Sequence, residues 1–230
     1  MDLKKILLLM TLLAVFASFG FSQAAAVPTY NRDFQLWNDT QIIIPLDKKK
    51  EWSFVIWAFG RFGDNARTTT DARIGGLITK KINKNISVAG GYLYRYSNAT
   101  FVRRRYESRY IGSVTFTVPL GKKFTFVNRN QIQYEDRYLR LNAFVFRPRV
   151  TLKREVTVGK TKIEPFVSFE PFIDSVLGGA ARYREQIGIG HKFNKALSAN
   201  FFYVRQDETG NGRRPGTLNG FGTSLKVTVR

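Results

Sequence analysis

Arginine and glutamate alternate with other residues along 103–110, which reads Arg-Arg-Arg-Tyr-Glu-Ser-Arg-Tyr. In a β-strand successive side chains point to opposite faces. Arg105, Glu107 and Arg109 therefore share one face, and the two tyrosines share the other. Guanidinium and carboxylate groups at this spacing can pair bidentately across neighbouring strands, or attract an anion together. The chemistry that this segment suggests is charge recognition.

The same alternation recurs in 124–137, 142–154, 161–172 and 182–193, with apolar residues at the intervening positions. A soluble sheet turns its apolar face inward, but here the charged face is the more organised one. This pattern predicts an inside-out barrel with lipid outside and a hydrated, charged lumen. The candidate site is the lumen charge network, which comprises Arg105, Glu107, Arg109, Arg129, Glu135, Arg137, Arg147, Arg149, Glu170 and Arg184.

Two roles are open for this charge network. In the first, the arginines pair with carboxylates and form a satisfied polar core. In the second, the surplus of seven arginines over three glutamates makes the interior an anion-attracting passage or binding site. The two roles are compatible, because three glutamates cannot neutralise seven arginines and the interior therefore keeps a net positive charge.

The elements that position these residues are short strands. The predicted segments are 33–44, 52–62, 71–80, 86–96, 104–118, 124–137, 142–154, 161–172, 182–193, 196–206 and 218–229. Many approach the ~9–11 residues that a tilted membrane strand needs. The predicted fold class is all-β, a single antiparallel up-and-down transmembrane β-barrel of 10–12 strands with a polar Arg/Glu-lined lumen. Bacterial single-chain barrels carry even strand numbers, which favours ten or twelve.

Short predicted turns alternate with longer polar connections. Outer-membrane barrels have short periplasmic turns and longer external loops, so the alternation places 63–70 and 207–217 outside and the C-terminus in the periplasm. The prolines Pro148, Pro165 and Pro171 fall inside predicted strands, where each removes a ladder donor. We expect local bends there.

The first residues are typical of an export signal. Lys4 and Lys5 precede the apolar stretch 6–21, and small residues follow it. We expect residues 1–24 to be a cleaved signal peptide and 25–230 to be the outer-membrane barrel domain. The chain has no cysteine, so it has no disulfide framework. The predicted localisation is the cell outer membrane.

The formal net charge of +20 suggests nucleic-acid or polyanion binding as another interpretation. However, the basic residues are spread singly at alternate positions, and an exported chain meets little nucleic acid. We therefore expect outer-membrane lipids and small anions as partners, and no nucleic acid. The sequence leaves the oligomeric state open.

No catalytic constellation is predicted. The single histidine, His191, falls on the lipid-facing parity near a short turn, as an interfacial histidine would. A Ser–His pair would need it close to a serine in the outer half of the barrel. No His, Cys or carboxylate cluster has metal-ligand spacing. We expect no catalytic residues, no metal and no cofactor.

Several segments resemble a bacterial family known as domain of unknown function 2490. They are Asp33-Phe34-Gln35-Leu36-Trp37, Arg61-Phe62, residues 128–135, Phe146-Arg147-Pro148-Arg149 and Glu164-Pro165 with Glu170. The resemblance covers nearly the whole chain after the signal and implies a small outer-membrane barrel. It implies no activity and no catalytic residues.

Three functional hypotheses follow. The first is a small outer-membrane barrel whose basic lumen forms a narrow anion-selective channel or a binding barrel. The second is an outer-membrane lipid-modifying enzyme. The third is a soluble periplasmic or secreted ligand-binding barrel, in which the apolar face lines the lumen and the 105–109 segment faces water.

Overall fold

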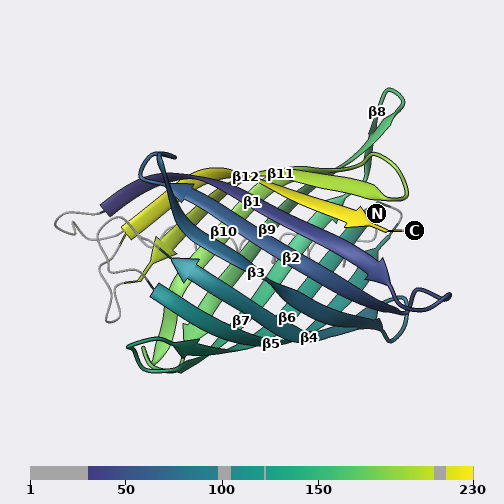
Figure 1. Cartoon of the computed structure of the whole chain (residues 1–230). Helices are drawn as coiled ribbons and strands as arrows, with labels where there is room; N and C mark the ends of the chain where they lie inside the picture. Colours follow the sequence, from purple (N-terminus) through teal and green to yellow (C-terminus); the bar gives the residue numbers. More distant parts are fainter. Residues whose placement is uncertain (1–30, 98–104, 122, 210–215, 230) are drawn as a thin grey trace. The chain divides into compact units, whose positions relative to one another are not determined.

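The computed structural model describes residues 31–97, 105–121, 123–209 and 216–229. The predicted signal peptide lies outside the described residues. Within them the chain forms one compact unit built from β-strands (Figure 1). None of the described residues form a helix with the length and apolar character to cross a membrane.

One strand corresponds to each of the eleven predicted segments, and one further short strand follows the seventh. Their bounds are β1 Asn31–Pro45, β2 Trp52–Gly63, β3 Thr68–Lys81, β4 Ile86–Ser97, β5 Arg105–Leu120, β6 Phe124–Arg137, β7 Ala143–Arg154, β8 Val156–Val158, β9 Thr161–Asp174, β10 Gly179–Lys192, β11 Leu197–Glu208 and β12 Gly216–Thr228. Alternating polarity therefore located the strands correctly.

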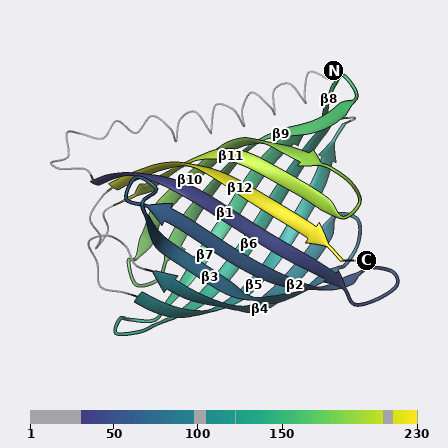
Figure 2. The same ribbon diagram turned by 45° about the horizontal axis from the view of Figure 1, so that its top comes forward.

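Eleven of these strands close into a barrel. Each strand pairs with its neighbour in the chain, β7 pairs with β9, and β1 pairs with β12 to close the ring (Figures 1 and 2). The short β8 pairs only with the first residues of β9, and its hairpin projects beyond the rim (Figure 1). The prediction of an all-β barrel with 10–12 strands is confirmed.

Two details of that prediction were wrong. The ring holds an odd number of strands rather than ten or twelve, and β1 runs parallel to β12, from Asn31 opposite Gly216 to Ile43 opposite Thr228. In a closed ring of an odd number of strands, alternating directions must meet in one parallel pair. All other neighbours in the ring are antiparallel.

The described connections at the two ends of the barrel differ less in length than the sequence predicts. One end, here called the loop end, carries 64–67, 138–142 and 175–178; the opposite turn end carries 46–51, 82–85 and 193–196. The strands extend into the predicted loops because β3, β9, β10 and β11 continue the ladder there. Length alone therefore does not assign these connections to sides of a membrane.

The ladder between β7 and β9 is interrupted where two prolines meet. Pairing runs through Phe146 with Ile173, and resumes at Val150 with Phe169. Pro148 and Pro171 lie in the gap, where neither can donate a backbone hydrogen bond. The predicted local irregularity is therefore present at these two positions.

The lumen carries the predicted arginines and glutamates, and it also contains apolar side chains. Three small apolar clusters lie on the inward parity, with cores at Trp37, Leu93 and Phe172. The β2 segment, whose two faces are both apolar in sequence, turns Val55 and Trp57 inward beside Leu93 and its neighbours. The barrel thus encloses apolar side chains together with the charged ones.

Candidate functional site

The structure brings the predicted charge network together on the lumen side of the barrel. Strand alternation positions each side chain, and cross-strand register places opposite charges side by side: Arg95 opposite Glu107, Glu107 opposite Arg137 and Arg109 opposite Glu135. Such directly opposed charge pairs stabilise neighbouring strands. The network divides into two groups, one around Glu107 and Glu135 and the other around Glu170.

Glu107 is the centre of the first group and is only 2% exposed. It accepts hydrogen bonds from Arg95 Nη1 at 2.9 Å and from Arg109 Nε at 2.9 Å. The side chain of Arg140, from the connection between β6 and β7, also pairs with it. Two strands, β4 and β5, and one connection are therefore tied to a single buried carboxylate.

Glu135 continues this group toward β9. It accepts from Arg137 Nη2 at 2.7 Å and pairs with Arg109 Nη2 at 3.1 Å. Arg137 also donates to Asp174 Oδ2 at 2.8 Å. Arg105 lines a small cavity of about 70 Å³ beside these residues. These bonds link β5, β6 and β9 on the lumen side in the loop half of the barrel.

Glu170 is the centre of the second group and is 1% exposed. It pairs with Arg129 Nη2 at 2.6 Å, Arg147 Nη2 at 2.9 Å and Arg184 Nη1 at 3.2 Å. Arg147 and Arg184 also lie over the ring of Phe172, at 4.3 and 4.7 Å from its centroid. Three guanidinium groups thus share one carboxylate, and two of them, those of Arg147 and Arg184, also share an aromatic face.

The hydrogen-bond partners of Arg149 among the described residues are both neutral. Its Nη2 donates to Ser168 Oγ at 3.2 Å and to the amide oxygen of Gln186. It lies directly opposite Arg129 on β6, so two guanidinium groups are neighbours on one face. Like charges directly opposite each other are destabilising unless they are compensated. Positive charge is therefore in excess at this point.

Sequence reasoning missed several members of the network. Asp71 accepts from Arg73 Nε at 2.8 Å and pairs with Arg95 Nη2 at 2.6 Å. Asp174 and Arg140 lie outside the predicted strand segments. Asp71 and Arg73 follow the same two-residue alternation in β3, which is the signal that identified the other strands.

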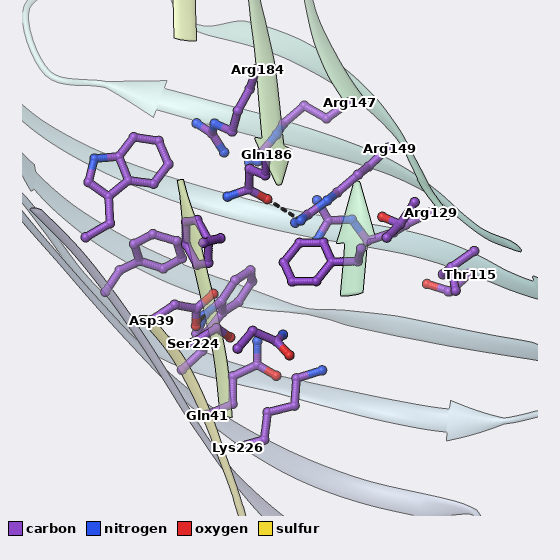
Figure 3. A pocket seen from close by; sticks show the side chains of 18 of the residues that line it. Asp39, Gln41, Thr115, Arg129, Arg147, Arg149, Arg184, Gln186, Ser224 and Lys226 are labelled. Atoms are coloured by element: carbon purple, nitrogen blue, oxygen red, sulfur yellow. Dashed lines mark hydrogen bonds between the residues drawn. The ribbon is translucent and has the colours of Figure 1, made fainter. Parts of the chain in front are cut away.

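A cavity of about 290 Å³ lies beside the second group. Arg129, Arg147, Arg149 and Arg184 line it from one side, and residues of β1 and β12 line it from the other (Figure 3). Its lining extends to Lys153 near the turn end of β7. The cavity therefore extends from the second group into the turn half of the lumen, while the ion pairs around Glu107 and Glu135 occupy the loop half.

Some polar atoms in this region have no hydrogen-bond partner among the described residues. They include Nε of Arg129 and Nε of Arg147, both on residues that line the cavity. A buried donor without a partner costs free energy. These two buried donors therefore leave an uncompensated polar cost beside the cavity.

His191 lies apart from the charge network. Its Nδ1 is 2.9 Å from the carbonyl oxygen of Lys162, and its ring meets Phe193 edge to face at 4.6 Å. The hydrogen-bond pattern around it includes no serine hydroxyl. In the described part of the chain no three His, Cys, Asp or Glu side chains are grouped so as to hold a metal ion.

The fold and this site define a closed β-barrel with an ion-paired interior and a basic cavity. A family model described as "Protein of unknown function (DUF2490)" matches residues 34–215, so the chain belongs to that family. This confirms the resemblance noted in the sequence. Neither the curated proteins nor the solved structures contain a match to the chain.

Proposed function

We propose that this protein is a small outer-membrane β-barrel that binds small anions in the basic half of a lumen whose other half is filled by ion pairs. The observation that carries the proposal is the distribution of charge between the two faces. Ionised groups such as Glu107 and Glu170 are buried inside, while large apolar side chains are exposed outside. This is the arrangement that a lipid environment favours.

The outer face supports membrane insertion. Its charged residues, such as Lys80 and Arg154, lie within three residues of a strand end. The exception is Glu185, which lies opposite Arg205 on the neighbouring strand. The middle of the barrel exposes large apolar side chains such as Ile74 and Ile187, each at 59%. A continuous apolar band of this kind is unfavourable in water.

Aromatic side chains border the band at both ends. At the loop end, tyrosines of β4, β5 and β6 lie in contact, with Tyr110 5.5 Å from Tyr92 and 6.2 Å from Tyr134 between ring centroids. At the turn end Trp52 and Phe193 are exposed. Amphipathic rings at two levels match the interfacial girdles of membrane barrels.

The burial of the ion pairs favours a binding barrel over a conducting channel. A narrow barrel of this strand number leaves little room beyond its side chains. Here Glu107 and Glu135 are held by several arginines in the loop half, whereas the larger cavity lies in the turn half. An anion can reach the arginines of the cavity without crossing the ion-paired layer.

The two alternatives receive less support. The soluble-barrel hypothesis requires the 105–109 segment to face water, but Glu107 and Arg109 are buried in the lumen. The lipid-modifying enzyme requires His191 to act with a nucleophile, and this histidine instead contacts a backbone carbonyl group. We therefore favour a non-enzymatic barrel.

The test of membrane insertion is cell fractionation combined with gel mobility of boiled and unboiled samples. We expect the protein in the outer-membrane fraction, with a heat-dependent shift. The Ile74→Arg variant should lose folded, membrane-inserted protein, because arginine on the lipid face costs ~2–4 kcal/mol at mid-membrane. The matched control is Val158→Arg, since Val158 is equally exposed at 59% but lies on the β8 hairpin outside the ring.

A soluble protein with heat-independent mobility would contradict the proposal. Equal tolerance of both arginine substitutions would also contradict it, because only lipid distinguishes two equally exposed positions.

A further inference from the structure

The cavity in the turn half is bordered by three chemically different surfaces. The first, here called the polar seam, lies where β1, β11 and β12 meet and consists of Asp39, Gln41, Asn200, Ser224 and Lys226. Register places Asp39 opposite Ser224, Gln41 opposite Lys226, and Asn200 opposite Ser224. The parallel closure of the barrel therefore builds a continuous patch of hydrogen-bonding groups.

Most side chains of the polar seam form no hydrogen bond within the described chain. The side chains of Gln41, Asn200 and Ser224 make no hydrogen bond with another residue of the described chain. Asp39 accepts one hydrogen bond, from Trp57 Nε1 at 2.5 Å. Donors and acceptors that face a cavity without internal partners are available to the hydroxyl groups of a ligand.

The second surface is basic and comes from β6 and β7. Arg129 and Arg149 are directly opposite each other, and Lys153 follows four residues after Arg149 on the same face. The nearest carboxylate to Lys153 is the rim residue Glu164, at 3.8 Å. Figure 3 shows Arg129, Arg147 and Arg149 across the cavity from Asp39, Ser224 and Lys226. The neighbouring guanidinium groups of Arg129 and Arg149 can together pair with a carboxylate.

The third surface is aromatic. Trp57, Phe59, Phe166 and Phe202 line the cavity from β2, β9 and β11. Aromatic rings offer flat apolar faces on which the C–H face of a ring-shaped ligand can pack. A simple inorganic anion would use only the basic surface and leave both other surfaces without contacts.

We propose that this cavity binds an acidic sugar. Its carboxylate pairs with Arg129 and Arg149, its hydroxyl groups bond to the polar seam, and its ring packs on the aromatic surface. The volume of about 290 Å³ suits a ligand of one or two rings. This inference rests on the proposed function, because it names the class of anion that the lumen binds.

The test uses the full chain in detergent micelles and four probes: D-glucuronate, D-glucose, benzoate and inorganic phosphate. Trp37 and Trp57 line the cavity, so tryptophan fluorescence reports occupancy, and calorimetry gives the affinity. We expect glucuronate to bind at least about tenfold more tightly than each of the other three probes. Glucose lacks the charge, benzoate lacks the hydroxyl groups, and phosphate lacks the sugar ring with its hydroxyl groups.

Two variants distinguish the contribution of the basic surface to binding from that of the polar seam. Arg149→Gln should weaken glucuronate binding about tenfold or more and leave glucose unchanged, because only a charged partner is lost. Asn200→Ala should weaken glucuronate and glucose alike and leave benzoate unchanged. The matched control is Lys192→Gln, since Lys192 is an exposed cation at the end of β10 outside the cavity lining.

The outcomes distinguish this inference from the proposed function. Benzoate or phosphate binding as tightly as glucuronate would overturn sugar recognition and leave anion binding in place. Binding by none of the four probes would overturn both. Equal losses in Arg149→Gln and Lys192→Gln would show that general charge attraction, rather than the cavity, holds the ligand.

Discussion

Glu170 illustrates how one buried carboxylate organises this lumen. It is held by Arg129, Arg147 and Arg184, and each of these comes from a different strand. Removing one partner of a buried charge cluster leaves the others uncompensated. The stability of the second group therefore depends on this side chain more than on any one arginine around it.

We predict that Glu170→Gln lowers the free energy of unfolding by about 3–5 kcal/mol, because three guanidinium groups lose their shared countercharge. Urea unfolding in detergent micelles, followed by gel mobility, measures the change. The matched control is Glu164→Gln, whose side chain is 53% exposed and lies 3.8 Å from Lys153. That variant should change stability by at most about 1 kcal/mol. Similar losses in the two variants would contradict the role assigned to Glu170.

At the scale of elements, the parallel pairing of β1 and β12 sets the structure of the barrel seam. Gly220 lies opposite Gln35, and a Cβ atom at this glycine would come within 2.2 Å of the Gln35 carbonyl oxygen. A backbone atom cannot move aside as the end of a side chain can. The seam therefore requires glycine at this position.

We predict that Gly220→Ala destabilises the folded barrel by at least about 1–3 kcal/mol, because the added methyl group forces β1 and β12 apart. The control is Gly112→Ala, where the nearest atom to the new Cβ is Cγ2 of Ile132 at 3.7 Å. Temperature-dependent gel mobility of the two variants makes the comparison. A Gly220→Ala barrel as heat-resistant as the parent chain would show that the seam adapts.

At the scale of the whole molecule, the two halves of the lumen differ in what they contain. The loop half carries ion pairs between buried groups, and the turn half carries the cavity with unpaired polar side chains. A barrel of this kind has a binding cavity without a wide bore. Measuring ion conduction tests whether the barrel has a closed binding cavity or an open bore.

We predict that the parent chain gives no steady conductance in a planar bilayer. The double variant Glu135→Ala, Arg137→Ala should conduct with anion preference, because it removes opposite charges together and opens space within an arginine-rich layer. The matched control removes the exposed pair Lys162 and Glu155, whose atoms are 2.9 Å apart near the β8 hairpin. Steady anion-selective current through the parent chain would instead support the channel hypothesis.

The sequence alone determined the strands and the direction of their faces, because alternation of polarity is a local property with a period of two. It located all eleven ring strands and placed charges such as Glu107 and Arg109 on one shared face. It also identified the family. These features need no knowledge of which strand lies beside which.

The tertiary structure decided what depends on closure. The parallel contact of β1 with β12 joins residues far apart in the chain, such as Asp39 and Ser224, and no local pattern records that contact. The sharing of Glu170 by three arginines and the position of the cavity likewise follow from the ring. Alternation decides which way a side chain points, but only the closed barrel decides which side chains it meets.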